Sequence, residues 1–246
     1  MGTICSFSGI YENQEGFPFD EYKMISLKDI SGCNGYCDPM AEKELENRLT
    51  PCSLRDIHLL DNGNYHYLTR IWLKKMRGAF ELLVFDHHTD MQPSALLPVL
   101  SCGNWILECL KDETMDLKRV WLIGPQRDAY ERIEEEVKEK IVFISQEEAD
   151  AFTEDTKKSL MQKKANYPMY ISIDKDVLSK KVLETNWDQG SMSTETLLKW
   201  LMFFREQYRI EGIDICGETE NGMKGEKKGV LVNNEIINCM KDAIRI

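Results

Sequence analysis

Long apolar runs and an excess of positive charge are both missing from this sequence of 246 residues. No segment approaches the ~20 consecutive apolar residues that cross a bilayer, and no secretory signal is visible. We therefore expect a cytoplasmic protein without a membrane partner. Lysine and arginine together number 31, against 42 aspartate and glutamate residues, and the formal net charge is −11. This balance argues against a nucleic-acid partner and is compatible with a cationic substrate.

Histidine is scarce, with four residues in the chain, whereas cysteine is plentiful, with eight. Without a secretory signal, the cysteines are expected to be reduced thiols. Cys33 and Cys37 have a spacing compatible with half a zinc site, but no second pair and no nearby histidine completes it. The sequence therefore favours a packed or exposed loop at these two positions.

Short apolar segments alternate with helical patterns along the chain. The expected strands are apolar and often β-branched, as in strands buried on both faces: Thr3–Phe7, Leu54–Leu60, Phe80–Phe85, Arg119–Ile123, Ile141–Ile144, Met169–Ile173 and Tyr208–Ile215. The expected helices lie between them: Ala41–Arg48, Tyr67–Met76, Trp105–Lys111, Tyr130–Glu139, Glu147–Lys163, Thr194–Phe204 and Asn233–Ala243. The stretch Glu220–Gly229 predicts a mobile surface loop. This order predicts an α/β fold, a single three-layer αβα domain over residues 1–246 with a mainly parallel central sheet.

The third expected strand stops abruptly at a group of titratable side chains, in the stretch ELLVFDHHTDMQ. In folds of this class, sites form where strands end at their carboxyl edge. Alternate residues of an extended chain share a face. Asp86, His88 and Asp90 can therefore converge on a site. His87 and Thr89 are expected to point away from it.

A second strand ends in the same pattern. Asp174 and Asp176 follow the apolar run MYISI, with Lys175 between them pointing away. One such strand end is weak evidence for a site, but two that agree are much stronger. His66 adds a third contribution, because it lies just after another expected strand and at the start of a helix. His58 lies inside that strand and is interpreted as a core residue.

The charges of this group predict bound metal. Packed together without cations, the four carboxylates would raise one another's pKa values and destabilise the fold. One divalent ion leaves a surplus of two negative charges, whereas two ions balance all four. Six ligands, two of them able to bridge, suit two metals ~3.5–4 Å apart, and a water between such metals becomes hydroxide near neutral pH. Oxygen-rich ligands with one histidine per metal favour Mn²⁺, with other divalent ions also compatible.

From about Leu54 onward, the sequence resembles the ureohydrolases, the arginase and agmatinase family, which share the arginase/deacetylase fold. The stretch GNYHY, which contains His66, stands in place of that family's Gly-Gly-Asp-His-Ser-like turn. The stretch DHHTD matches its Asp-Ala-His-x-Asp motif, and SIDKD matches its Ser-x-Asp-x-Asp motif. All six metal-ligand positions of the family are filled, in order.

The resemblance implies a role for each ligand position. His66 and Asp90 would belong to one manganese ion. His88 and Asp176 would belong to the other.

The two remaining acids, Asp86 and Asp174, would bridge the ions in such a centre. Asp90 would also hold the bridging hydroxide for attack on a guanidinium carbon, which releases urea and an amine. The implied substrates are arginine, agmatine, a guanidino acid, guanidine itself or an arginine within a peptide. The resemblance also suggests a homo-oligomer.

Two departures from the family pattern concern catalysis. In the segment SCGNWI, Ile106 occupies the position where arginases have a histidine that transfers protons. In the late motif GIDICGETE, Asp214 matches the family, but Gly217 occupies the usual glutamate position. Shifted by one residue, Glu218 becomes the predicted guanidinium-binding carboxylate, with Glu220 as the alternative. Both glutamates can also be read as solvated loop acids.

Three further residues are predicted to contact the substrate. Gln92 lies two residues beyond Asp90, where arginases contact the α-polar groups of their substrate. Trp187 and Asp188 replace a Pro/Gly/Thr-rich turn of the family and could stack on and neutralise a guanidinium group. Alternatively, Trp187 covers the core and Asp188 indirectly caps the following helix.

Two other functions fit the same residues. One is a mononuclear zinc deacetylase or amidohydrolase that uses Asp86, His88 and Asp174. The other is a non-catalytic descendant that binds metal for stability or for a partner.

Overall fold

The computed structural model describes residues 2–14, 16–17, 19–93, 99–220 and 226–244. Its centre is an eight-stranded sheet in which every neighbouring pair of strands is parallel, in the order β2-β1-β4-β10-β9-β5-β7-β8. The strands are β1 (Gly2–Ser6), β2 (Tyr22–Ser26), β4 (Ile57–Leu59), β5 (Phe80–Phe85), β7 (Leu117–Ile123), β8 (Ile141–Ile144), β9 (Met169–Asp174) and β10 (Ile210–Cys216). A separate antiparallel pair joins β3 (Tyr36–Cys37) to β6 (Leu100–Ser101). The predicted parallel α/β fold is confirmed.

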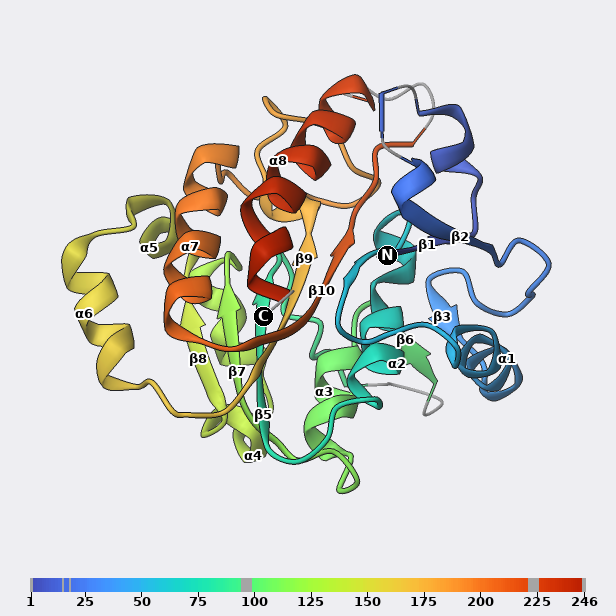
Figure 1. The fold of residues 1–246 in the computed structure, drawn as a ribbon. Helices are drawn as coiled ribbons and strands as arrows, with labels where there is room; N and C mark the ends of the chain where they lie inside the picture. The colour runs from blue at the N-terminus through green and yellow to red at the C-terminus, as the bar shows by residue number, and fades with distance from the viewer. Residues whose placement is uncertain (1, 15, 18, 94–98, 221–225, 245–246) are drawn as a thin grey trace.

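Helices cover both faces of this sheet, because its strands are apolar on both faces (Figure 1). In β5, Leu82 and Val84 pack into one core, while Leu83 and Phe85 pack into the other. The first core is completed by α1 (Pro39–Leu49), α2 (Thr69–Leu73) and α3 (Trp105–Lys111). The second is completed by α5 (Gln146–Ala151), α6 (Glu154–Gln162), α7 (Thr194–Gln207) and α8 (Glu226–Ile244). None of the described helices is long and apolar enough to cross a membrane.

Several predicted boundaries are wrong. The single helix expected over Glu147–Lys163 is two helices, because Phe152 adopts a left-handed backbone (φ 35°) and Thr153 caps a new helix. The edge strand β2 escaped prediction because its side chains are mostly exposed and carry no apolar run. Helix α8 begins at Glu226, so the predicted loop Glu220–Gly229 is wrong at its end, and residues 221–225 lie outside the described residues.

Other elements are shorter or less regular than expected. The segment around His66 is a 3-10 helix, η3 (Gly63–Leu68), which leads into α2. Two further 3-10 helices, η1 (Ile10–Asn13) and η2 (Phe19–Glu21), precede β2. The helix expected over Tyr130–Glu139 is a 3-10 helix, η4 (Arg127–Arg132), followed by a short α4 (Glu135–Lys138).

The sheet brings the predicted site residues to one edge. Strands β5 and β9 are neighbours, with Phe85 opposite Ile173, so Asp86 and Asp174 follow at adjacent strand ends. Strand β10 lies on the other side of β9, with Cys216 opposite Asp174. Because all these strands are parallel, their carboxyl ends meet on the same side of the sheet.

Candidate metal centre

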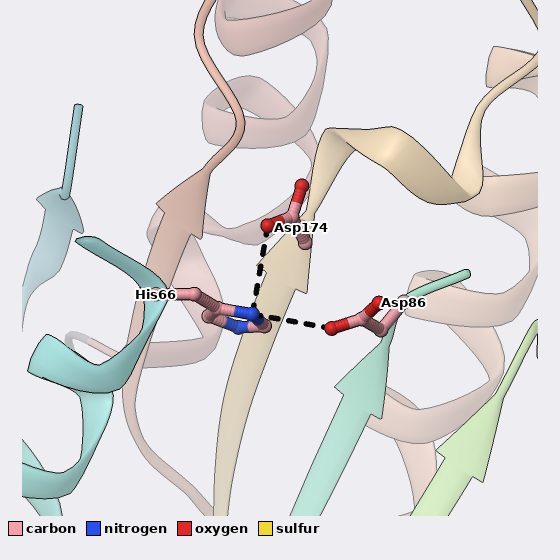
Figure 2. A group of neighbouring side chains, drawn as sticks. All are labelled: His66, Asp86 and Asp174. Carbon is pink, nitrogen blue, oxygen red and sulfur yellow. Dashed lines mark ion pairs between the residues drawn. The ribbon is translucent and has the colours of Figure 1, made fainter. Parts of the chain in front are cut away.

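All six predicted metal ligands line one cavity of about 240 Å³ at the carboxyl edge of the sheet. Five of them are buried, and His88 is half-buried. They come from the turn after β5, from the end of β9, from the 3-10 helix η5 (Lys175–Val177) and from η3. The two aspartates and the histidine drawn in Figure 2 point toward one another from three different elements. Segments far apart in the sequence thus supply one site.

The ligand atoms form two overlapping groups. The first consists of His66, Asp86 and Asp174, and the second of Asp86, His88 and Asp176. In each group the potential ligand atoms lie within 4.8 Å of one another. Asp86 belongs to both groups, as a bridging ligand would. Asp174 belongs to the first group only, and Asp90 belongs to neither, so the bridging role of Asp174 and the ligand role of Asp90 stay predictions.

One histidine nitrogen faces three carboxylates. His66 Nδ1 lies 3.1 Å from Asp86 Oδ2 and 3.5 Å from Asp174 Oδ2 (Figure 2). It also lies 3.0 Å from Asp90 Oδ2. In the second group, His88 Nδ1 lies 2.8 Å from Asp176 Oδ2. Such contacts require positive charge at their centre, supplied either by a proton on the imidazole or by a metal ion.

The other ring nitrogen of His66 is held in a way that suits a metal ligand. The Ser172 hydroxyl donates to Asp214 Oδ1 at 2.7 Å, and His66 Nε2 lies 2.9 Å from the same hydroxyl oxygen. Because that hydroxyl proton is used, Ser172 accepts from the Nε2–H of His66. The neutral imidazole then presents the Nδ1 lone pair to the cavity, which is the tautomer that a metal ligand needs.

Burial and mutual repulsion shift the pKa values of the site acids. Burial, followed by the charge on Asp86, raises the pKa of Asp90 to about 7. Burial and the neighbouring Asp174 charge likewise raise the pKa of Asp176. Asp86 goes the other way, because hydrogen bonds from His66 and His88 outweigh burial and lower its pKa. The donor set thus carries more negative charge than the protein alone compensates, which fits divalent cations.

The negative charge of the neighbouring aspartates raises the pKa values of both site histidines. Burial alone would lower the pKa of His88, but hydrogen bonds to Asp176 and Asp86 outweigh it and raise the pKa to about 12. The pKa of His66 is raised well above its usual value for the same reason, through Asp86 and Asp90. Without a cation, both imidazoles hold a proton that a metal would displace.

Asp90 is held in place by both backbone and side-chain contacts. Its backbone is left-handed (φ 48°), a conformation that aspartate tolerates better than most residues. Its Oδ2 accepts a 2.6 Å hydrogen bond from the indole Nε1 of the fully buried Trp105. The turn after β5 is therefore not an extended strand, although Asp86, His88 and Asp90 converge as predicted.

The predicted substrate-binding residues divide into two sets. Gln92 and Trp187 line the cavity, and the Trp187 ring, 42% exposed, meets His88 edge-on at 5.9 Å between centroids. Trp187 Nε1 donates to Asn64 Oδ1 at 3.0 Å. Asp188 is exposed and is not among the described residues that line the cavity.

Glu218 does not occupy the position that a guanidinium-binding carboxylate needs, and this prediction is corrected. Its side chain is fully buried in an ion pair with Lys175, at 2.7 Å, and it does not belong to the described lining of the cavity. The neighbouring Gly217 has φ 78°, and a Cβ there would lie 2.3 Å from Asp174 Oδ1. A glutamate therefore does not fit at position 217. Glu220, the alternative, accepts from Asn62 Nδ2 at 2.9 Å.

Several residues set aside in the sequence are indeed structural. His58 is buried and stacks on Trp72 at 3.8 Å between ring centroids. Ile106 is buried in α3, so the position of the family's proton-transferring histidine belongs to the core. Cys33 and Cys37 are buried free thiols that belong to neither metal-ligand group found among the described residues. His87 is likewise outside both groups.

Three contributors to the site escaped prediction. Ser172 lies two residues before Asp174 on β9, a spacing that already places both on one face of the strand. Ser101, at the end of β6, and Cys102, which follows it, also line the cavity. Only the resemblance of SCGN to an arginase segment indicated that stretch, and nothing in its composition did.

Known proteins share this fold and part of this sequence. The model of the arginase family matches residues 9–216. An uncharacterized protein of Thermotoga maritima is 32% identical over 217 residues, which cover 88% of this chain and 79% of that protein.

Two solved structures have the same fold. Arginase from Entamoeba histolytica, solved with L-ornithine, aligns with a TM-score of 0.71 at 14% identity over 96% of this chain and 97% of its own. Formiminoglutamase from Trypanosoma cruzi, solved with Mn²⁺, aligns with a TM-score of 0.66 at 11% identity over 97% and 93%. The family match spans most of the described strands and all of the ligand motifs. The chain therefore belongs to the arginase family, as a divergent member.

Proposed function

We propose that this chain is a binuclear manganese hydrolase that cleaves a C–N bond of a guanidino compound, either a small molecule or an arginine within a peptide, and releases urea and an amine. The observation that carries the proposal is the pair of ligand groups that share Asp86. The two groups contain five residues, three of them aspartates, and Asp90 lines the same cavity. Such a donor set suits two oxygen-preferring divalent ions better than a thiolate-preferring one.

A single zinc ion satisfies this site less well. A mononuclear site at Asp86, His88 and Asp174 would leave His66 Nδ1 facing Asp90 at 3.0 Å without a cation of its own. His66 is nevertheless oriented by Ser172 as a metal-ligating histidine would be. His66 and Asp90 would therefore be available to bind a second cation.

Two bound Mn²⁺ ions would supply a water that is deprotonated near neutral pH. The chain itself orients that water and the substrate. Asp90, fixed by the Trp105 indole N–H, is the acid placed to accept a hydrogen bond from the attacking water. Burial, followed by the charge on Asp86, raises the pKa of Asp90.

Substrate recognition would rest on the rim of the cavity. No lysine or arginine is found among the described residues of the lining, whereas four aspartates line it, which suits a cationic substrate. The Trp187 indole can bind a guanidinium group over its face, and Gln92 can contact the polar end of the substrate. Trp187 rests directly against Gly63, where a Cβ would lie 2.5 Å from Trp187 Cδ1. A side chain at position 63 would displace the ring.

The proposal is tested with manganese-reconstituted protein and a substrate panel. We expect two Mn²⁺ per chain by elemental analysis. We also expect urea release from at least one of arginine, agmatine, a guanidino acid, guanidine or a peptide with an internal arginine. Acetyl-lysine peptides serve as the deacetylase probe.

Asp174→Asn is the matched variant, because it keeps the shape of the side chain and removes one ligand charge. It should lose metal and urea release together. One zinc per chain with acetate release would support the mononuclear function instead. Two Mn²⁺ without hydrolysis of any probe would support the non-catalytic descendant.

A further inference from the structure

A buried ion pair lies directly behind the metal ligands. Lys175, between Asp174 and Asp176, is fully buried, and its Nζ lies 2.7 Å from Glu218 Oε1 and 3.0 Å from Asn233 Oδ1. Glu218, also fully buried, lies just beyond the end of β10, and Asn233 lies in α8. The pair therefore connects the η5 turn to two other elements.

Both carboxylate oxygens of Glu218 accept further hydrogen bonds. Asn233 Nδ2 donates to Glu218 Oε1 at 2.7 Å, and Gln14 Nε2 donates to Glu218 Oε2 at 3.0 Å. Gln14 and Asn233 are buried as well. The network is thus enclosed by protein and separated from the cavity, whose described lining contains none of these side chains.

Such a pair is a poor way to gain stability. Desolvation of two charges largely offsets their attraction, and apolar residues of similar volume are often as stable or more so. What a buried, fully hydrogen-bonded pair does provide is a unique geometry. In this turn, that geometry includes the direction of the two flanking aspartates, because all three side chains are attached to the same short stretch of backbone.

We propose that Lys175 and Glu218 are positioning residues. Their ion pair fixes the η5 turn so that Asp174 and Asp176 face the metal cavity. The inference rests on the metal centre of the proposed function. It assigns Glu218 a task at the back of the turn in place of the predicted contact with substrate.

The packing of β10 against the turn supports this assignment. Gly217 lies so close that a Cβ would come within 2.8 Å of the Lys175 backbone nitrogen. The strand end that carries Glu218 therefore touches the backbone that carries the ligands. Asp176 N also donates to Asp174 Oδ1 at 2.9 Å, so a displaced turn would misplace both carboxylates together.

Positioning and simple electrostatics predict different results for Lys175. Removing its positive charge near the metals would strengthen cation binding if only charge mattered. If Lys175 fixes the turn, Lys175→Met weakens manganese binding despite that charge effect. Glu218→Gln weakens manganese binding on either account. The lysine variant is therefore the decisive one.

The experiment measures free Mn²⁺ by electron paramagnetic resonance during titration of the full chain. Circular dichroism defines a temperature at which each variant is folded. We expect Lys175→Met and Glu218→Gln each to raise the manganese Kd by about 10- to 100-fold, as is usual for residues that orient metal ligands. The Lys175→Met/Glu218→Gln double variant contains no unpaired buried charge. Its Tm should recover toward that of the wild type while its manganese Kd stays weakened.

Glu81→Gln is the matched control. Glu81 is also fully buried and charged, accepts from Trp121 Nε1 at 2.6 Å and pairs with Arg119, but it lies near the opposite end of β5 from Asp86. It should lower Tm without changing the manganese Kd. A Kd that stays wild-type in the double variant, or tightens in Lys175→Met, overturns the inference. Failure of the wild type to bind manganese at all would instead reject the proposed function.

Discussion

Single residues show why the ligands could be predicted from sequence and their supports could not. Asp86, His88 and Asp90 follow an apolar strand at alternate positions, and this local pattern survives even though the chain turns there. The role of Glu218 depends instead on Lys175 and on helix α8, which no local pattern reveals. Spacing along the chain indicates which residues can meet, but not which partner a buried charge will choose.

Ser172 is expected to control the metal-binding tautomer of His66. Ser172→Ala removes the acceptor of the Nε2–H, so the imidazole is no longer held with Nδ1 toward the cavity. We expect the manganese Kd to rise by about 10- to 100-fold in a titration with free Mn²⁺ detection. Ser6→Ala is the matched control, because Ser6 is also fully buried in the sheet and its hydroxyl has no described partner. An equal loss of manganese affinity in both variants would mean that altered packing causes the effect.

The adjacent histidines should behave differently. His88 belongs to the second ligand group, whereas His87 belongs to neither, so His88→Ala should lose about half of the bound manganese and His87→Ala should keep all of it. Elemental analysis after desalting measures both. Loss of metal from the His87 variant would mean that the turn after β5 directs its side chains differently.

At the scale of elements, the sheet was easier to predict than the helix boundaries. Buried parallel strands are continuous apolar runs, so the sequence locates β5, β8 and β9 to within one residue at each end, and β7 to within two. The break between α5 and α6 was missed, although Thr153 followed by Glu154 and Asp155 is a helix-start signal. An amphipathic pattern continues through such a break, so only the capping residue marks it.

The capping box of α5 gives a stability prediction. The Ser145 hydroxyl accepts from the Glu148 backbone N–H, and the Glu148 carboxylate accepts from the Ser145 backbone N–H. Ser145→Ala should lower the free energy of unfolding by about 1 kcal/mol, measured by urea denaturation. Ser145→Thr keeps the hydroxyl, so its free energy of unfolding should fall by less. If the free energy of unfolding falls equally in both variants, the cap is not the cause. Metal content should be unchanged in each.

At the scale of the whole molecule, stability and metal binding should be linked through protons. Asp90 and Asp176 have raised pKa values, so the metal-free folded chain binds protons more tightly than the unfolded chain does. Their contribution to stability is lost as pH rises from the usual carboxyl range through about 7 for Asp90. The stability contributed by His66 and His88 depends on pH in the same direction. Their contribution is complete below the usual histidine pKa and declines above it.

The stability contributed by Asp86 changes with pH in the opposite direction, but its lowered pKa affects stability only at acidic pH. Its contribution is present above the usual carboxyl pKa and is lost as pH falls below it. Near neutral pH, the shifts of the other site groups therefore act together. Rising pH destabilises the metal-free chain.

Bound manganese should remove this dependence, because the metal replaces the protons that the site otherwise retains. We therefore expect the difference in Tm between manganese-loaded and EDTA-treated protein to widen from about pH 5.5 to about pH 8.5. Differential scanning calorimetry at fixed ionic strength measures it. Asp90→Asn removes one of the raised pKa values and should flatten the curve of the EDTA-treated protein, whereas His87→Ala should leave the widening intact. A gap that stays constant across this range would mean that the four carboxylates are compensated by the protein itself. The charge argument for two divalent ions would then fail, even if the fold and the family remain as described.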